Sequence, residues 1–191
     1  MTAEMILDTA LVHFARDGYE GASLREIAEA VGIKKPSIYA HFNSKETLFL
    51  RVVEHAFEHE RRAALAYFDS NSGGPVADRL RGYLEMVKTD YEYNSLAKFV
   101  WRMSYFPPRT LQQEVMAIVY PFLDSFEQIL VNYLNWSIRC GRLPASDAEA
   151  AAVAYMTLID GICVELLYED ADRFQRKLAA AWPLFWKAIS S

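Results

Sequence analysis

The stretch GIKKPSIYAHFNSK, residues 32–45, contains three lysines, a histidine, a tyrosine and two serines but no carboxylate. Ammonium, imidazole and hydroxyl groups are donors that proteins use to bind phosphate oxygens, and lysine and serine can also reach base edges. The chain as a whole is acidic, with a formal net charge of -5. The stretch therefore predicts a local positive face suited to a polyanion, although a solvated turn with two lysines would have the same composition.

A second pattern, HAFEH at residues 55–59, places His55 and His59 one helical turn apart with Glu58 between them. This order fits H-x-x-E-H, in which two imidazoles hold zinc and the glutamate acts as a base. A zinc-dependent hydrolase using these three residues is therefore an alternative. The favoured interpretation is a polar helical face, because the pattern supplies no third ligand, and we expect no metal, no cofactor and no enzymatic activity.

The composition is that of an ordinary globular chain of 191 residues, 52% of them hydrophobic. The first eighteen residues lack the basic start of a secretory signal, and no uncharged apolar run approaches the roughly 18 residues that a membrane span requires. Cys140 and Cys163 stand alone without CxxC spacing, which is typical of a reducing compartment. We therefore expect a cytoplasmic protein with no membrane partner.

The elements that must position these residues are helices. Apolar residues recur at helical spacing, as in Leu7, Leu11 and Phe14, and no segment alternates with period two long enough to predict a strand. Glycine and proline divide the pattern into about nine helices. The expected fold is all-α, with a small N-terminal three-helix domain, residues 1–46, joined by a long helix to a larger helical domain, residues 47–191.

The basic stretch lies in a helix-turn-helix plan. Ser23 and Glu26 form a capping box that starts a short helix, in which each side chain bonds the backbone amide of the other. Gly32 stands where that helix would end in a left-handed residue. The second helix, about residues 35–41, is the one that such a motif inserts into the major groove of DNA.

The sequence GYEGASLREIAEAVGIKKPSIYAHFNSKETLF resembles the DNA-binding domain of the TetR/AcrR family of bacterial transcriptional regulators. The match runs from about Ile6 to Phe49 in the family's order, from the first helix to the Ser-Lys-Glu start of the fourth. It implies a homodimeric regulator, usually a repressor, that leaves a palindromic double-stranded operator when a small-molecule inducer binds the C-terminal ligand-binding and dimerisation domain. Many relatives carry a basic tail before the first helix, whereas this chain begins MTAEM, so no minor-groove arm is expected.

Carried over by position, the resemblance implies a set of DNA-binding residues. Those expected at base edges or sugars are Lys34, Lys35, Pro36, Ser37 and Ala40. Those expected at phosphates are Ser23, Tyr39, His41 and Lys45, and Arg25 could reach either.

Two apolar stripes near the end of the chain are candidates for a homodimer interface, which the family builds from its last two helices. The stripe residues are Ile159, Ile162, Leu166, Phe174, Leu178, Trp182 and Phe185. The same stripes could instead face only the core of one protomer. They would also suit a helical adaptor that binds protein and not DNA.

Aromatic residues are dense between residues 83 and 136, which favours a pocket for a small, largely apolar or aromatic ligand, although aromatic residues at helical spacing more often form core. The candidate pocket residues are Tyr83, Trp101, Tyr105, Phe122, Phe126 and Asp160. The carboxylate of Asp160 could compensate a cationic ligand or simply face water.

Overall fold

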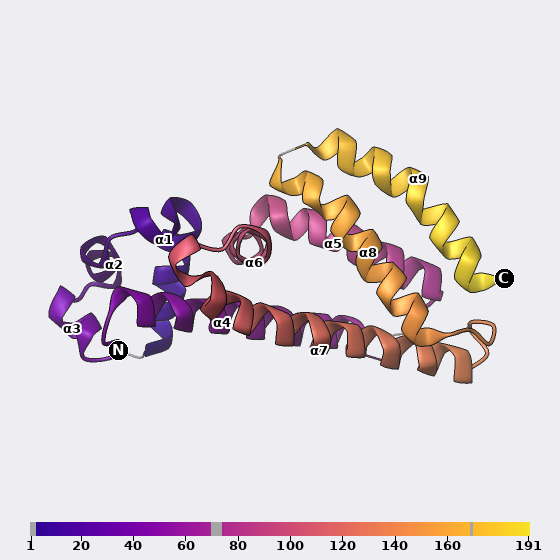
Figure 1. Ribbon diagram of the computed structural model, residues 1–191, viewed down its shortest axis with the longest axis horizontal. Helices are drawn as coiled ribbons and strands as arrows, with labels where there is room; N and C mark the ends of the chain where they lie inside the picture. Colours follow the sequence, from indigo (N-terminus) through magenta and orange to yellow (C-terminus); the bar gives the residue numbers. More distant parts are fainter. Residues whose placement is uncertain (1–2, 70–73, 169) are drawn as a thin grey trace. The chain divides into compact units, whose positions relative to one another are not determined.

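The computed structural model describes residues 3–69, 74–168 and 170–191, and within these ranges it is all-α, as predicted, with no strand (Figure 1). The helices are α1 (Ala3–Gly21), α2 (Leu24–Val31), α3 (Lys35–Tyr39), α4 (Lys45–Tyr67), α5 (Val76–Tyr93), α6 (Ser95–Tyr105), α7 (Gln112–Arg139), α8 (Ala148–Leu167) and α9 (Ala171–Ser190), with a short 3-10 turn, η1 (Arg109–Leu111), before α7. These nine α-helices of the described chain match the number expected from the sequence.

The chain folds into two compact units. The first comprises Met1–Glu60 and Tyr93–Phe122, and the second comprises Arg61–Glu92 and Leu123–Ser191. The division expected at residue 46 falls inside the first unit, because the N-terminal helices pack with the first part of α4 and with α6.

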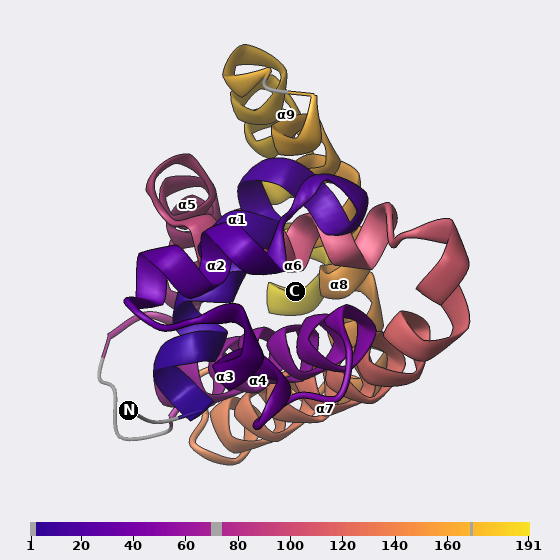
Figure 2. The same cartoon turned by 90° about the vertical axis from the view of Figure 1, so that its left-hand side faces the viewer.

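The core of the first unit contains three aromatic rings in successive edge-to-face contact. The ring of Phe14 on α1 meets that of Phe49 on α4 edge-on at 5.0 Å between centroids, and Phe49 meets Phe99 on α6 at 6.0 Å. All three side chains are fully buried. Helix α6 lies beside α1 in both views of the ribbon (Figures 1 and 2), so α6 completes the core on which the helix-turn-helix rests.

The second unit is built around α8, which packs against α9 and is tied to α5. The hydroxyl of Tyr155 on α8 is buried and donates to the carbonyl of Leu80 on α5 at 2.5 Å. Burial raises the pKa of Tyr155 well above its ordinary range, so this hydroxyl remains a donor. A hydrogen bond of this kind fixes the position of α8 because an unpaired buried hydroxyl is costly.

By length and composition alone, α8 could cross a membrane. Core helices pass the same criterion, and here Ile159 and Cys163 are buried inside the second unit. The helix also contains Asp160 and Glu165, and charges of this kind are costly in hydrocarbon. The apolar composition of α8 is therefore accounted for by its packing in the core.

Candidate nucleic-acid interface

Helix α2 begins at the predicted residue but with a different capping contact. Ser23 is extended, and its hydroxyl accepts from the backbone amide of Arg25 at 3.3 Å, not from that of Glu26. The carboxylate of Glu26 lies 3.9 Å from the guanidinium of Arg16 on α1. The Ser23 cap is confirmed, whereas the reciprocal bond from Glu26 is replaced by an ion pair that the local pattern could not show.

The turn after α2 has the expected left-handed residue. Gly32 adopts φ 80° and ψ 29°, its amide donates to the carbonyl of Glu29 at 3.1 Å, and the amide of Ile33 donates to that of Ala28 at 2.9 Å. These bonds satisfy carbonyls at the end of α2. The backbone reverses here and leads directly into α3.

Helix α3 is held to the unit by two apolar side chains. Ile38 is fully buried and Phe42, just after the helix, is 5% exposed, and the amide of Phe42 donates to the carbonyl of Ile38 at 2.8 Å. The helix ends at Tyr39, two residues before its predicted end, and α4 follows with Ser44 as cap, accepting from the Thr47 amide at 3.0 Å. Figure 2 views the unit with α2 and α3 toward the reader.

The side chains around this anchor are open to solvent. The exposed residues are Lys34, Lys35, Pro36, Ser37, Tyr39, Ala40 and His41. The Tyr39 side chain is 45% exposed, so its ring and hydroxyl can be reached from solvent. The structure thus gathers seven of the ten predicted DNA-binding residues on and beside α3, and the continuous segment that contains them carries no carboxylate.

Two contacts adjust the electrostatics of this face. The ammonium of Lys35 lies 5.9 Å from the ring centroid of Tyr39, one turn further along α3. On α2, the Arg25 guanidinium bonds the carboxylate of Glu29 at 2.8 Å, and this hydrogen bond raises the pKa of Arg25. Arg25 would therefore have to exchange Glu29 for a phosphate or a base edge in order to contact DNA.

Lys45, the first residue of α4, is held more firmly than the sequence suggested. Its ammonium donates to the backbone carbonyl of Glu20 at 3.1 Å and lies 5.0 Å from the ring centroid of Tyr19. Both partners belong to the end of α1, far from Lys45 in sequence. No local pattern could have predicted this contact, although the glycine before Tyr19 marks an irregular helix end.

The HAFEH pattern, the basis of the alternative zinc site, lies on α4, and one of its histidines already meets a carboxylate. Nε2 of His55 is 3.1 Å from a carboxylate oxygen of Asp8 on α1. Among the described residues, the one group of three possible metal ligands whose atoms lie within 4.8 Å of one another is His13, Asp17 and Glu26. It includes neither His55 nor His59.

The cluster of His13, Asp17 and Glu26 already contains a positively charged side chain, that of Arg16. Arg16 bonds the carboxylate of Asp17 at 2.7 Å and lies 3.4 Å from Nδ1 of His13. The hydrogen bond from Arg16 lowers the pKa of Asp17. A guanidinium in this position neutralises the carboxylates, so the cluster is an ion-pair network at the surface.

The residues predicted for a dimer interface occupy the inner side of α8 and α9. Five of them are at most 5% exposed in the single chain: Ile159, Ile162, Leu166, Phe174 and Leu178. Trp182 is nearly as buried, and Phe185 is half-buried with its ring 5.5 Å from that of Tyr155. In the single chain both stripes pack mainly against the protomer's own core, and Ile162 and Phe185 also line the groove between α8 and α9.

The predicted pocket residues are divided between the two units. In the second unit, Tyr83 and Phe126 stack at 5.4 Å, and Asp160 is exposed on α8. In the first unit, Trp101 stacks on Tyr105 at 5.9 Å, and Phe122 meets Phe57 at 5.2 Å.

A fuller aromatic cluster is present in the second unit than the sequence suggested. Its members are Tyr67, Phe68, Tyr83, Phe126 and Tyr133, with ring centroids 5.0 to 6.3 Å apart along the cluster. Tyr67 is the last residue of α4 and Phe68 directly follows it, Tyr83 lies on α5, and α7 supplies Phe126 and Tyr133. Three helices therefore meet at this point. Burial raises the pKa of Tyr67 and of Tyr133, and both hydroxyls therefore stay neutral.

Comparison with known proteins adds independent findings. Residues 6–52 match the family described as "Bacterial regulatory proteins, tetR family". A Staphylococcus aureus protein, the "Biofilm operon icaADBC HTH-type negative transcriptional regulator IcaR", is 39% identical over 97 residues, which are 51% of each chain. The chain therefore spans about half the length of the curated relatives it matches.

Solved structures resemble the chain over nearly its whole length. A Mesorhizobium loti protein described as a TetR-family transcriptional regulator superposes with a TM-score of 0.79 at 19% identity, covering 99% of this chain and 96% of the other. The transcriptional regulator FadR from Bacillus subtilis, solved with stearoyl-CoA, gives 0.69 at 16% identity, covering 96% and 97%. At these identities the likeness concerns the fold.

Proposed function

Because this chain belongs to the TetR family of bacterial transcriptional regulators, we propose that it represses transcription by binding a palindromic DNA operator as a homodimer. A small apolar or aromatic molecule bound in the helical domain, residues 47–191, would release it. The observation that carries the proposal is α3, on which Ile38 is fully buried while Lys35 and Tyr39, and Lys34 just before the helix, are exposed. An anchored helix with a carboxylate-free outer face is what entry into a major groove requires.

The exposed groups on and beside α3 suit two kinds of DNA contact. The ammonium groups of Lys34 and Lys35 can donate to guanine O6 and N7, and the Ser37 hydroxyl can adapt to several bases. Tyr39 and His41, at the end of the helix, can donate to phosphates. One five-residue helix buries too little surface for tight binding, so a second copy of the chain on a second half-site is needed.

The outer side of α8 and α9 supports the homodimer. A shallow apolar groove runs between the two helices, lined by Ala154, Thr157, Leu158, Gly161, Ile162, Lys177, Ala180, Ala181 and Phe185. Val153 on α8 and Leu184 on α9 are 49% and 73% exposed. Small side chains allow close approach of helices, and a patch of this kind can meet its own copy across a two-fold axis. This face, which includes Ile162 and Phe185 of the predicted stripes, is the proposed interface.

The aromatic cluster of the second unit supports an apolar or aromatic effector. Tyr67, Phe68 and Tyr83 pack ring against ring at 5.0 to 5.3 Å between centroids. A site lined by such rings favours planar or acyl ligands over charged ones. FadR, which shares the fold, was solved with stearoyl-CoA. The effector would act only if it binds the DNA-bound and released conformations with different affinity.

The test is enrichment of random duplex DNA by the purified protein at two salt concentrations, with Tyr39→Ala as the control. We expect a palindromic consensus whose affinity falls steeply with salt and disappears in the variant. Lys35→Ala should instead relax the preference at one base position, at a cost of about 1–3 kcal/mol. If neither salt concentration yields enrichment, the DNA-binding proposal is wrong. The helical adaptor and the zinc hydrolase are then the alternative functions to test.

A further inference from the structure

The end of α1 contains a break that turns Tyr19 toward the start of α4. Gly18 adopts φ 72° and ψ 178°, a combination that interrupts the helix and that glycine tolerates without the strain a side chain would bring. The helix resumes, and the amide of Ala22 donates to the carbonyl of Gly18 at 3.2 Å. The residue directly after the break, Tyr19, is thus placed by backbone geometry.

The Tyr19 ring has a neighbour in the core and a neighbour at the surface. Its centroid is 4.9 Å from that of Phe49, within the aromatic core of the first unit. It is also 5.0 Å from the ammonium of Lys45, within cation–π range. Burial, with the carboxylates of Glu46 and Glu20 nearby, raises the pKa of Tyr19, so the ring stays neutral and keeps its attraction for a cation.

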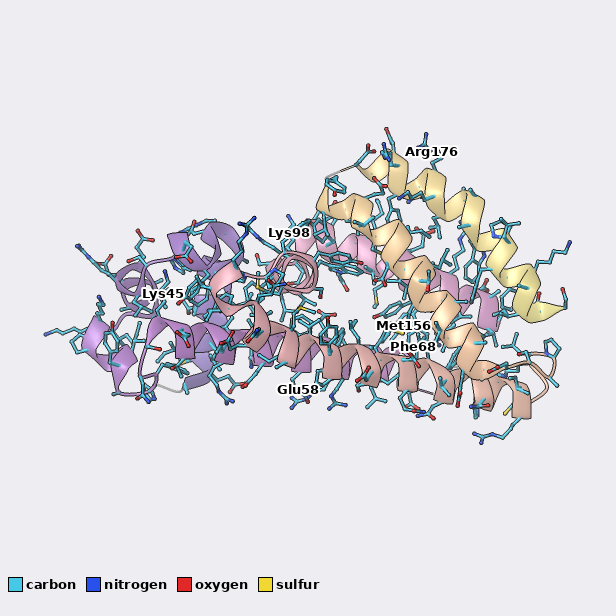
Figure 3. All side chains as sticks on the ribbon, in the orientation of Figure 1. Lys45, Glu58, Phe68, Lys98, Met156 and Arg176 are labelled. Carbon is cyan, nitrogen blue, oxygen red and sulfur yellow. The ribbon has the colours of Figure 1, made fainter. Side chains whose placement is uncertain are left out.

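Lys45 is therefore fixed from two sides. The backbone carbonyl of Glu20 accepts one of its N–H groups at 3.1 Å, and the Tyr19 ring packs against the ammonium. The remaining N–H groups stay available, and the side chain is half-buried, not enclosed. In Figure 3 Lys45 is labelled near the start of α4. Ser44 caps this helix end, and the positive end of the helix dipole there favours an anion.

We infer that Tyr19, together with the Glu20 carbonyl, is a positioning residue that holds the Lys45 ammonium in place for a DNA phosphate. A free lysine side chain must give up rotamer freedom to make such a contact, and a side chain that is already ordered gives up less. The inference rests on the proposed DNA-binding function. It adds that one phosphate contact depends on a tyrosine that does not itself touch DNA.

The experiment measures the affinity of the full-length protein for its selected operator duplex as a function of salt. We compare wild type with Tyr19→Leu, Tyr19→Phe, Lys45→Gln and the double variant Tyr19→Leu/Lys45→Gln. Losing one phosphate contact should reduce the slope of log affinity against log salt by about 0.9. Lys45→Gln should show this reduction, and Tyr19→Leu should show part of it. Tyr19→Phe should behave like wild type, because the ring is retained.

The double variant separates positioning from general packing. If Tyr19 acts through Lys45, Tyr19→Leu should cause no further loss once Lys45 is glutamine. Phe99→Leu, which disturbs the same core one ring further from Tyr19, serves as the matched control and should leave the salt slope unchanged. Each variant is first checked for a wild-type unfolding temperature, and Tyr19→Met replaces Tyr19→Leu if the latter does not fold.

Additive losses in the double variant would overturn the inference, as would an unchanged salt slope in Lys45→Gln. In either case the wild type would still bind its operator, so the proposed function would stand. If the wild-type protein shows no salt-dependent affinity for DNA, both the proposed function and the inference about Tyr19 are wrong.

Discussion

Gly32 is the single residue on which the turn before α3 depends most directly. Its φ of 80° is disfavoured for side chains that carry a Cβ, yet nothing lies within 4 Å of the position that a Cβ would occupy. Gly32→Ala should therefore destabilise the protein through backbone strain alone, by about 1 kcal/mol. Urea unfolding measures this cost. Gly141→Ala, at a second left-handed glycine with open space around its Cβ position, should show a similar cost.

The buried carboxylate of Glu165 gives a residue-scale prediction about pH. It bonds the ammonium of Lys177 and, at 2.9 Å, the guanidinium of Arg173, and these bonds, that of Lys177 foremost, lower its pKa from 4.5. A lowered folded-state pKa contributes stability that is complete above 4.5 and is lost as the pH falls through the folded value.

The measurement is the difference in unfolding free energy between wild type and Glu165→Gln across pH. Wild type should be more stable at neutral pH, and the difference should shrink as the solution becomes more acidic than pH 4.5. Asp17, whose pKa is lowered by Arg16, is present in both proteins and cancels in the difference. A gap that stays constant down to low pH would show that the ion pairs of Glu165 contribute nothing.

Local patterns predicted single residues where the controlling physics is local. The Ser23 cap and the left-handed Gly32 depend on hydrogen bonds within a few residues, so the sequence predicted them correctly. Glu26 pairs with Arg16 and Lys45 with the end of α1, because side chains distant in sequence lie closer in the fold than the local alternatives. Such contacts require the tertiary structure.

At the scale of elements, a close contact joins α5 to the end of α4. It predicts that replacing a helical glycine by alanine destabilises the protein. A Cβ on Gly82 would lie 2.8 Å from the hydroxyl of Tyr67, which is fixed by donating to the carbonyl of Arg79 at 3.0 Å. Gly82→Ala should therefore destabilise the protein, although alanine is the better helix former by about 1 kcal/mol.

Removing the hydroxyl should reverse the sign. In a Tyr67→Phe background the clash is relieved, and Gly82→Ala should become stabilising by up to about 1 kcal/mol. Thermal or urea unfolding of the four proteins in this cycle gives the answer. The same sign in both backgrounds would mean that the Tyr67 ring moves aside and that the contact does not determine the packing of α5.

Helical periodicity predicted the elements better than it predicted their faces. The stripes through Ile159 and Leu178 are real and apolar, but a stripe does not say whether it packs on its own chain or on another. The structure buries them, and the outer groove has a weaker sequence signal because alanine and glycine, as in Gly161 and Ala180, carry little hydrophobic contrast. The length of α3 was overestimated for a similar reason, since its end is decided by how Phe42 enters the core.

At the scale of the whole molecule, the proposed function depends on a second copy, and the two faces of α9 separate association from folding. Ala180 lines the outer groove and is exposed, whereas Leu178 is 1% exposed against the core. Ala180→Glu should therefore place a charge in the dimer interface without disturbing the protomer. Leu178→Ala should leave a cavity inside the protomer and cost about 2–5 kcal/mol of stability.

Sedimentation equilibrium and operator binding distinguish these effects. Wild type should sediment as a dimer with an unfolding temperature that rises with protein concentration. Ala180→Glu should sediment as a monomer, lose that concentration dependence and bind the operator more weakly, because one half-site alone offers too few contacts. Leu178→Ala should unfold at lower temperature but remain a dimer while folded. If Ala180→Glu stayed dimeric and bound the operator like wild type, the outer face of α8 and α9 would be excluded as the interface.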